Sequence, residues 1–536
     1  MGIQETLSLN SSLNIHNDDD DETYTMPIST ALSTALHPQN WPTSIWVLLL
    51  TGVAYAVGFL AYRPSFPRNA PKLFKGYPVL GTPRFFTDRG NFLTEGRRFG
   101  SSGNWSFYFG KMRIVGLSGE QGRQVFFESR DLDFTKGYGA LFNATPRIEV
   151  SSNSSEEDSF AGKFNRNIVR LLRKEQLSKR LASLVNDTND TTTRLAARAD
   201  GISDPFEDMY RLVFQLTMRM VGCDEIAEDD ALLVQTLRIF ESIDAASTAT
   251  KVMFPWAPTV GHFRRVYSGA RMYMILEKVI KARKERGVEG TDALQYLMDQ
   301  GDSTVEMVAF IVGALFAGLI NSGINAAYLL CFLGADEKWY GEVRKEVDGV
   351  IAKHRKSADE TPEDVLSRFG VEDWEAEFPV IDLGLKETIR HTITGCGFRY
   401  NGTGRDIAIG ASGEVVPADS YAVYHFDDTH FDESIFEEPN RWDPARFLAP
   451  REEDKRDAHA FNGWGAGRHP CLGMRFAKLE TYVTTALFVA KFDFHLCDEN
   501  GKRMDKVPED SVDRNKHSAS KPKKKLCLKY TPRAKS

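Results

Sequence analysis

The pattern of apolar and charged positions places one long uncharged run near the start of the chain. Residues 44–62 carry no charge and are long enough to cross a bilayer as one helix. Arg63 and Lys72 follow this run, whereas the acidic residues 18–22 precede it. Because basic residues favour the cytosolic side, we expect the chain after the run to face the cytosol. The pattern predicts a disordered lumenal leader over 1–43 and a single-pass transmembrane anchor over 44–62.

A second uncharged run, residues 307–335, satisfies the same hydropathy test. Three glycines interrupt it, at Gly313, Gly318 and Gly323. A small polar stripe follows one helical face and consists of Gly318, Asn321, Ser322 and Asn325. A helix buried on all sides in a large domain is equally apolar. We therefore interpret this run as a central core helix and not as a second transmembrane span.

The remaining pattern is mainly helical. Apolar positions recur at helical spacing over residues 164–200, 206–222, 229–247, 261–286 and 337–355. Residues 105–109 and 112–117 are typical of short strands, and prolines crowd residues 63–83 into a stiff hinge. No linker or repeat divides the rest. The expected fold is mainly α with small β-sheets, in a single large domain over 84–536.

Composition narrows the functional classes. The formal net charge is −7 over 536 residues, which gives no electrostatic footprint for nucleic acid. The six cysteines are widely scattered, which favours a reducing compartment over a disulfide framework. In the leader, Asn10 begins a glycosylation sequon and Gly2 fits a myristoylation pattern, and the sequence does not decide whether either is used.

One cysteine stands in a glycine-studded loop. Residues 464–473 read WGAGRHPCLG, and an amphipathic stretch follows Cys471 at once. A loop that leads into a helix N-terminus supplies backbone N–H groups and a positive dipole end, both of which stabilise a thiolate. No second Cys or His stands at zinc-like spacing. A single thiolate facing a flat partner indicates haem iron.

This loop resembles the haem-binding loop of the cytochrome P450 family, with Trp464 in the place of the usual Phe. Further motifs occur in the family's order. Residues 387–390 (ETIR) resemble its E-x-x-R motif, residues 439–442 (PNRW) resemble its P-x-R-aromatic motif, and residues 317–322 (AGLINS) resemble part of its central helix. The resemblance covers about residues 70–530. It implies haem b bound through Cys471, in a loop shaped by Gly467 and Gly473.

The resemblance also implies roles for other residues. His469 and Arg399 are expected to bind the haem propionates. Glu387, Arg390 and Arg441 are expected to form a charge network that holds the cysteine loop in place. The substrate pocket is expected to be apolar, with walls in residues 138–146, 394–398 and 507–512 and in the central helix.

The central helix departs from the family pattern. Members usually carry an acid and a threonine there, which relay protons during dioxygen activation, whereas this chain has Ile320 and Asn321. Gly318 is retained, and Asn321 and Ser322 offer polar groups that donate and accept. We expect a monooxygenase that oxidises a lipophilic small molecule, as fungal biosynthetic members do in secondary metabolism. The departure leaves open a haem-thiolate isomerase or dehydratase that needs no dioxygen, and a haem sensor without turnover is a third reading.

The resemblance further implies external redox partners. No flavin or iron–sulfur segment follows Cys471, so electrons are expected from NADPH–cytochrome P450 reductase, with cytochrome b5 as a possible assistant. Together with the anchor, this predicts a location in the endoplasmic reticulum membrane. We expect the reductase to dock on a basic face that includes Arg468, Arg475 and Lys478.

Overall fold

The computed structural model describes residues 12–14, 25–27, 39, 41–142, 160–255, 257–287 and 289–533. It forms two compact units, Met1–Pro64 and Ser65–Ser536. In the first unit, β1 (Ser12–Asn14) pairs antiparallel with β2 (Thr25–Pro27), and an apolar helix, α2, covers Thr43–Ala61. The hydrophobic side chains described for α2 are exposed. Asn10 and Gly2 lie outside the described residues, so their predicted modifications stay predictions.

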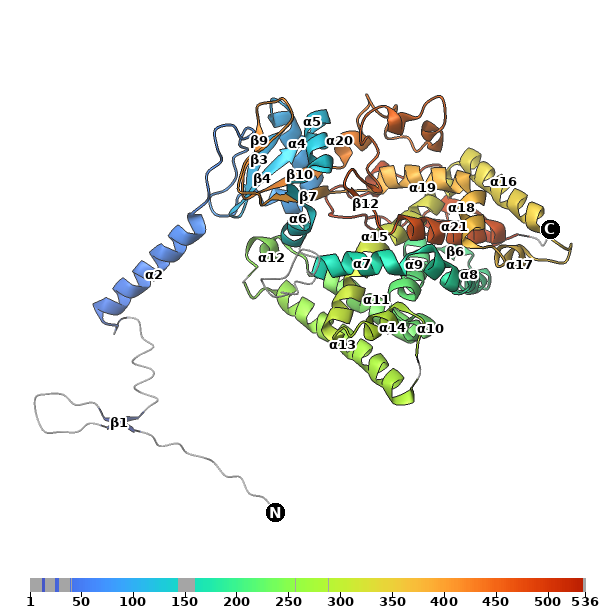
Figure 1. The fold of residues 1–536 in the computed structure, drawn as a ribbon, viewed down its shortest axis with the longest axis horizontal. Helices are drawn as coiled ribbons and strands as arrows, with labels where there is room; N and C mark the ends of the chain where they lie inside the picture. The colour runs from blue at the N-terminus through green and yellow to red at the C-terminus, as the bar shows by residue number, and fades with distance from the viewer. Residues whose placement is uncertain are drawn as a thin grey trace, which may run out of the picture. The chain divides into compact units, whose positions relative to one another are not determined.

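The second unit is mainly helical with small sheets, which confirms the expected fold class (Figure 1). Its helices are α3 (Arg84–Thr87), α4 (Arg89–Phe99), α5 (Gly119–Glu128), α6 (Phe134–Leu141), α7 (Phe160–Leu171), α8 (Lys174–Ala196), α9 (Pro205–Val221), α10 (Asp224–Glu228), α11 (Asp230–Asp244), α12 (Ala249–Met253), α13 (Val260–Arg286), α14 (Ala293–Asp299), α15 (Thr304–Ala335), α16 (Glu337–His354), α17 (Pro362–Leu366), α18 (Val371–Glu377), α19 (Pro379–Thr392), α20 (Asp427–His430) and α21 (Met474–Lys491).

The helix predicted over 164–200 is two helices. Residues 172–173 separate α7 from α8. The last buried residue of α7 is Leu171, and the first buried residue of α8 is Leu177. The spacing between these two residues is about one residue shorter than two full helical turns, so in a continuous helix they would lie on different faces. A continuous helix would rotate one of these faces away from the core, so the break keeps both faces buried.

The main sheet has five strands in the order β3 (Trp105–Phe109), β4 (Met112–Leu117), β10 (Ser420–His425), β7 (Cys396–Asn401) and β5 (Leu132–Asp133). The first two strands match the two predicted from sequence. In this sheet β10 and β4 pair in parallel, and the other neighbouring strands pair antiparallel. The smaller sheets contain β8 (Ile407–Ala408) with β9 (Val415–Val416), β11 (Gly465–Ala466) with β12 (His469–Pro470), and β13 (Phe492–Cys497) with β14 (Cys527–Pro532) and β6 (Ile202–Ser203).

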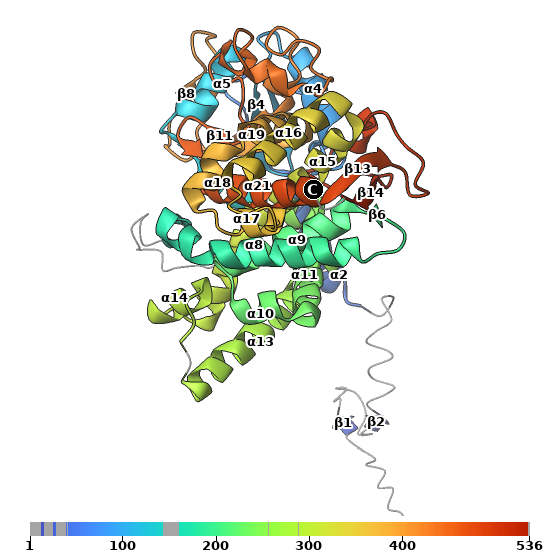
Figure 2. The ribbon, with the colours of Figure 1, turned by 90° about the vertical axis from the view of Figure 1, so that its right-hand side faces the viewer.

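Helix α15 is the central helix of the second unit (Figures 1 and 2). It contacts α9, α13, α19 and α21, and most of its residues are buried. Its 32 residues give a length of roughly 48 Å. Ser303 begins the helix with a capping box, in which its side chain and that of Glu306 each accept a backbone N–H of the other residue. The uncharged run 307–335 is therefore a core helix, as interpreted from the sequence.

The close approach of α15 to α9 depends on Gly323. A Cβ atom there would lie 2.7 Å from Cδ2 of Tyr210 on α9. We expect Gly323→Ala to lower the free energy of unfolding by about 1–3 kcal/mol through overpacking. Gly341→Ala in α16, where a Cβ meets nothing within 4 Å, is the matched control and should stabilise the protein slightly. Thermal unfolding followed by circular dichroism measures both, and equal midpoints for the two variants would contradict the packing argument.

Candidate active site

The cysteine loop is a tight hairpin that leads directly into α21. Strands β11 and β12 pair Gly465 with Pro470, and the N–H of Cys471 donates to the carbonyl of Trp464 at 2.7 Å. Gly467 has φ +58°, and a Cβ atom on it would collide with the carbonyl oxygen of Phe127. A side chain at this position is therefore excluded by both strain and space.

Cys471 differs from the other cysteines in its exposure. It is exposed, whereas the other five, all within the described residues, are buried. Its sulfur accepts backbone N–H groups of Gly473 and Met474, at the start of α21. Surrounding protein atoms raise the pKa of the thiol, and these two N–H groups act in the opposite direction. The sulfur is thus presented outward with donors already directed at it, which suits a thiolate bound to a cationic metal.

The buried cation Arg399 and the loop residue His469 share an aromatic neighbour. Arg399 on β7 is buried, and its guanidinium lies 4.9 Å from the ring centre of Phe134. The ring of His469 stacks on the same Phe134 at 4.9 Å. Burial lowers the pKa of Arg399 to about 10, and burial followed by nearby Arg399 lowers that of His469 to about 4. Among the described residues no carboxylate forms an ion pair with Arg399, so this pair fits the carboxylate groups of haem.

The exposed face of α15 is narrow. Ala317 and Asn321, one turn apart, are exposed in the interior of a helix that is otherwise buried or half-buried there. Gly318 is half-buried beside them, and a Cβ on it would make only an ordinary contact with Thr217. The helix continues through this segment without interruption. Asn321 is therefore the polar side chain that this face of α15 offers to a ligand.

Ser322, the third predicted residue on α15, points elsewhere. It is buried, and its hydroxyl donates to the carboxyl of Glu480 on α21. Glu480 is 1% exposed, and its Oε2 has no hydrogen-bond partner among the described residues. Burial raises the pKa of Glu480 to about 8, although the Ser322 hydrogen bond opposes that rise. Glu480 is not among the site residues predicted from the sequence, although its place as a single carboxylate on the apolar side of the helix that follows Cys471 is a signal for it.

A second buried network joins α19 to the loop before the cysteine. Arg390 donates to both oxygens of Glu387, at 2.9 and 2.8 Å, and the Nε of Arg446 donates to Glu387 Oε1 at 2.9 Å. All three side chains are 0% exposed. Burial alone would raise the pKa of Glu387, but Arg390 and His391 lower it well below its usual value.

The prediction that Arg441 completes this network is wrong. The Arg441 side chain is 69% exposed and pairs with Glu438 at 3.4 Å. A second Pro-x-Arg-aromatic sequence, Pro444-Ala445-Arg446-Phe447, follows a few residues later and supplies the arginine instead. Only the backbone carbonyl of Arg441 takes part, accepting from Arg446 Nη2 at 2.9 Å. The two tetrapeptides match the same sequence pattern, and the prediction falls on the one whose arginine is exposed.

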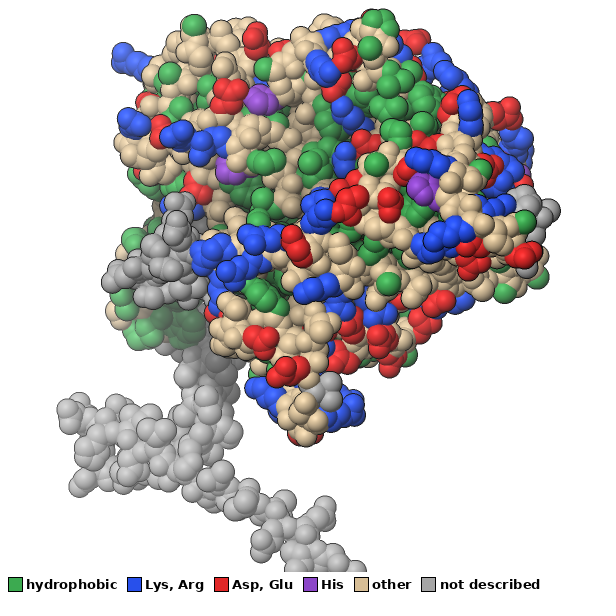
Figure 3. All heavy atoms as spheres, turned by 45° about the vertical axis from the view of Figure 1, so that its right-hand side comes forward, with side chains coloured by type: hydrophobic (Ala, Val, Ile, Leu, Met, Phe, Trp, Pro, Cys, Tyr) green, Lys and Arg blue, Asp and Glu red, His purple; other side chains and the backbone are tan. Residues whose placement is uncertain are grey.

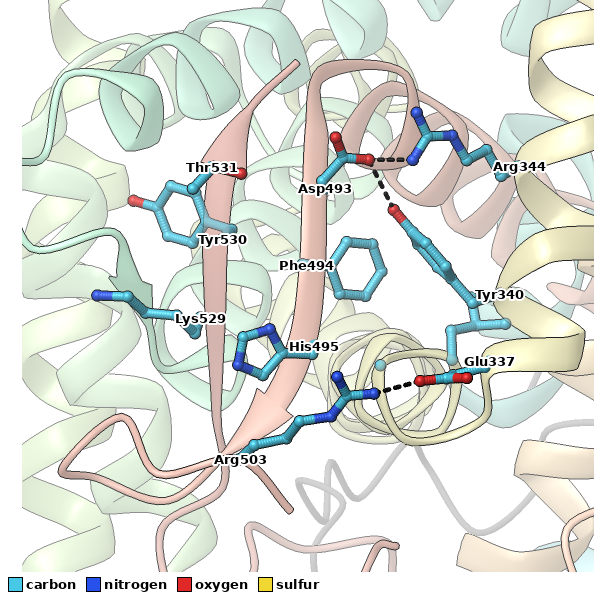
Figure 4. Close-up of a pocket in the computed structure, with 12 residues that line it drawn as sticks. Glu337, Tyr340, Arg344, Asp493, Phe494, His495, Arg503, Lys529, Tyr530 and Thr531 are labelled. Carbon is cyan, nitrogen blue, oxygen red and sulfur yellow. Dashed lines mark hydrogen bonds and ion pairs between the residues drawn. The ribbon is translucent and has the colours of Figure 1, made fainter. Parts of the chain in front are cut away.

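One surface hollow of the second unit lies away from the cysteine loop. It has a volume of about 390 Å³ and lies between α16 and the strands β13 and β14 (Figure 4). Ion pairs between Glu337 and Arg503 and between Arg344 and Asp493 bound it. None of its lining residues belongs to the cysteine loop or to the exposed face of α15, so it is not part of the candidate active site.

Comparison with known proteins identifies the class to which this fold and thiolate loop belong. Residues 104–521 match the family model described as cytochrome P450. The chain is 32% identical over 500 residues to the cytochrome P450 monooxygenase AacuE of Aspergillus aculeatus, covering 92% of this chain and 98% of that one. It is 29% identical over 498 residues to the monooxygenase dmxR5 of Cryptosporiopsis sp., covering 91% and 94%. A solved structure, retinoic acid-bound cyanobacterial CYP120A1, superposes with a TM-score of 0.67 at 18% identity, over 88% of this chain and 100% of that one.

The chain therefore belongs to the cytochrome P450 family. It is an oxidoreductase of the monooxygenase class, and the cofactor of this family is haem held by a cysteine thiolate. The family also uses redox partners and lipophilic substrates in general, and its eukaryotic members are often associated with membranes.

The contrast between Arg446 and Arg441 gives a matched test of the buried network. Arg446→Met leaves Glu387 with one fewer cation in a site without water access, which should cost about 3–5 kcal/mol and reduce haem incorporation severely. Arg441→Met removes only an exposed pair and should change stability by less than about 1 kcal/mol. Haem content per protein and the thermal midpoint measure both. Equal loss in the two variants would show that Arg441 has the structural role after all.

The buried carboxyl of Glu480 should make stability depend on pH. Its pKa is about 8 in the folded protein against an ordinary 4.5, so between these values the folded state binds the extra proton. The stabilisation is complete below the lower value and is lost as the pH rises through about 8, with a slope of up to about 1.4 kcal/mol per pH unit. Unfolding midpoints from pH 5.5 to 9 should fall more steeply for wild type than for Glu480→Gln. Glu346, whose pKa burial raises to about 7, accounts for part of the slope left in the variant. Parallel profiles would show that Glu480 does not hold its proton.

Proposed function

We propose that this protein is a membrane-anchored monooxygenase that oxidises a lipophilic small molecule at the haem bound through Cys471. The observation that carries the proposal is the outward-facing Cys471 sulfur, which accepts two N–H groups at the start of α21. Haem, when bound, supplies the activation of dioxygen and the insertion of one oxygen atom into the substrate. Arg399 and His469 would bind its propionates, and Trp464, Gly467 and Gly473 would shape the loop that supplies its cysteine ligand.

Proton supply in this proposal relies on residues that replace the usual acid and threonine. Asn321 is the exposed polar group on α15, and its amide both donates and accepts. Behind it, Ser322 connects α15 to the protonated carboxyl of Glu480. Glu480 is 1% exposed and holds a proton up to about pH 8, and the Ser322 side chain is its hydrogen-bonding neighbour. Gly318 keeps the adjacent backbone accessible.

Electrons come from NADPH–cytochrome P450 reductase in this proposal, with cytochrome b5 as an additional donor. Arg468 is exposed within the cysteine loop and suits an acidic partner. Arg475 and Lys478 pair with Glu375 and Asp382, at 2.8 and 2.7 Å, so the predicted basic face is partly neutralised. Acidic and basic side chains are also intermingled over the face shown in Figure 3. Specific contacts around Arg468 therefore matter more to docking here than a broad positive field.

Helix α2 supports the membrane part of the proposal. It is apolar, its described hydrophobic side chains are exposed, and it lies in a unit separate from the catalytic one. With Arg63 on its C-terminal side, we place the catalytic unit in the cytosol at the endoplasmic reticulum membrane. The leader over 1–43, the hinge over 63–83 and a role in fungal secondary metabolism stay predictions.

A haem-thiolate isomerase or dehydratase is the second candidate. The observation in its favour is Ile320, which is buried where the family usually carries an acid. The monooxygenases among the relatives and the Ser322–Glu480 connection favour the first candidate. Dependence of turnover on NADPH and reductase separates the two, because rearrangement or dehydration needs no external electrons.

Cys471 gives the direct test of the proposed haem site. Full-length protein loaded with haem, reduced and exposed to carbon monoxide should show the strongly red-shifted Soret band of thiolate ligation. Cys471→Ala should lose that band, whereas Cys497→Ala, which alters a buried cysteine on β13, should keep it. A band typical of histidine-ligated haem in the wild type would overturn the assignment of Cys471.

A further inference from the structure

Arg89, the first residue of α4, is a fully buried cation that no part of the proposed chemistry uses. Its side chain is 0% exposed, and its Nε donates to the carbonyl of Phe85 at 2.9 Å. Its two terminal nitrogens, Nη1 and Nη2, are buried and have no hydrogen-bond partner within the described part of the chain. No carboxylate pairs with it among those residues. Both prongs of the guanidinium fork are therefore free to donate.

Aromatic rings surround this guanidinium. Its carbon lies 5.0, 5.3 and 5.8 Å from the ring centres of Phe85, Phe86 and Phe398. These rings offset part of the cost of burying the charge, at about 0.5–2 kcal/mol each. They accept no conventional hydrogen bonds, however, and leaving charged donors unsatisfied in an apolar site is costly. An anion that accepts from both prongs would remove that cost.

The Arg89 site is distinct from the proposed propionate site. Phe398 and Arg399 are consecutive residues of β7, so their side chains point to opposite faces of the sheet. Phe398 contacts Arg89 on one face, whereas Arg399 lies against Phe126 and Phe134 on the other. A haem propionate bound to Arg399 is therefore not positioned to satisfy Arg89.

A second polar group without a partner lies nearby. The Nδ1 of His517 is buried and has no hydrogen-bond partner among the described residues, and the His517 ring packs edge-on against Phe86 at 4.4 Å. Burial, followed by Arg89 and Lys516, lowers the pKa of His517 to about 2, which keeps this imidazole neutral. The buried Cys396, whose pKa burial raises to about 11, also lies near Arg89 and stays a neutral thiol. Phe398 belongs to the predicted pocket wall 394–398, and His517 follows the predicted wall 507–512 by five residues in the chain.

We propose that Arg89 binds a carboxylate group of the substrate, with His517 and the surrounding phenylalanine rings holding an aromatic body next to it. This inference rests on the proposed function, because it assigns a substrate class to the same enzyme. A carboxylate matches the planar fork formed by Nη1 and Nη2, and the two parallel hydrogen bonds fix its orientation. The site therefore selects aromatic or polycyclic acids over their neutral esters and positions them by one end.

The test compares an acid with its neutral ester. The probes are anthracene-2-carboxylic acid and its methyl ester, added to full-length haem-loaded protein in detergent at pH 7, with binding followed by probe fluorescence. We expect the wild type to bind the acid at least about tenfold more tightly than the ester, as charge-assisted hydrogen bonds imply. Equal affinities, or no binding of the acid, would overturn the proposal.

Variants assign the preference to Arg89. Arg89→Met should abolish the preference for the acid, and Arg89→Lys should keep part of it, because lysine retains the charge without the fork. Arg98→Met, which alters an exposed arginine of the same helix, is the matched control and should keep the full preference. His517→Phe should weaken binding of the acid more than that of the ester. Retention of the full preference in Arg89→Met would also overturn the proposal.

The carbon monoxide spectrum of the same preparations keeps the two hypotheses separate. Loss of the thiolate band with the acid preference intact would count against the Cys471 assignment only. An intact band without an acid preference would count against the Arg89 site only.

Discussion

The architecture depends on one buried carboxylate, that of Glu387. It accepts hydrogen bonds from two guanidiniums, those of Arg390 on its own helix and Arg446 on a distant loop, and from the backbone N–H of Asp443 at 3.0 Å. An ionised group with no solvent exposure is tolerated only where such partners are complete. Because Arg446 also contacts the carbonyl of Glu437 and the carboxylate of Glu453, the network fixes the chain between β10 and the cysteine loop. The position of Cys471 is thus set by an ionic cluster that does not contact it.

The sequence was sufficient to predict those features that depend on residues close together in the chain. The glycine pattern around Cys471 determines the backbone geometry of its loop. The uncharged run of α15 determines the burial of that helix. Both features agree with the prediction. The choice between Arg441 and Arg446 was not local, since both stand in the same tetrapeptide pattern. Which arginine reaches Glu387 depends on how the loop folds back over α19, and only the tertiary structure records that.

The same limit explains Glu480 and Arg89. Each is a single charged residue in a helix. In the sequence Arg89 does not differ from a solvated neighbour, and Glu480 differs only in lying on the apolar side of its helix. Their significance comes from partners far along the chain, Ser322 on α15 in one case and Phe398 and His517 in the other. The polar residues of α15 show how such partners are arranged, because Ser322 reaches α21 while Asn325 accepts from Thr392 on α19. The small polar stripe seen in the sequence thus serves packing against two helices as well as the exposed face at Asn321.

The alternation of side chains along β7 has a consequence for how this enzyme can change. Pairing with β10 sets Arg399 opposite Ala422 and Phe398 opposite Val423. An insertion or deletion of one residue in the turn before β7 would shift the pairing of β7 with β10 by one residue. The sheet would stay intact, but each side chain of β7 would move to the opposite face of the sheet. The cation beside the cysteine loop would then face the aromatic cluster around Arg89, where like charges repel. The length of the turn formed by residues 393–395 is therefore constrained more tightly than its amino-acid composition. Variants with one residue more or fewer in this turn would still fold but would lose haem.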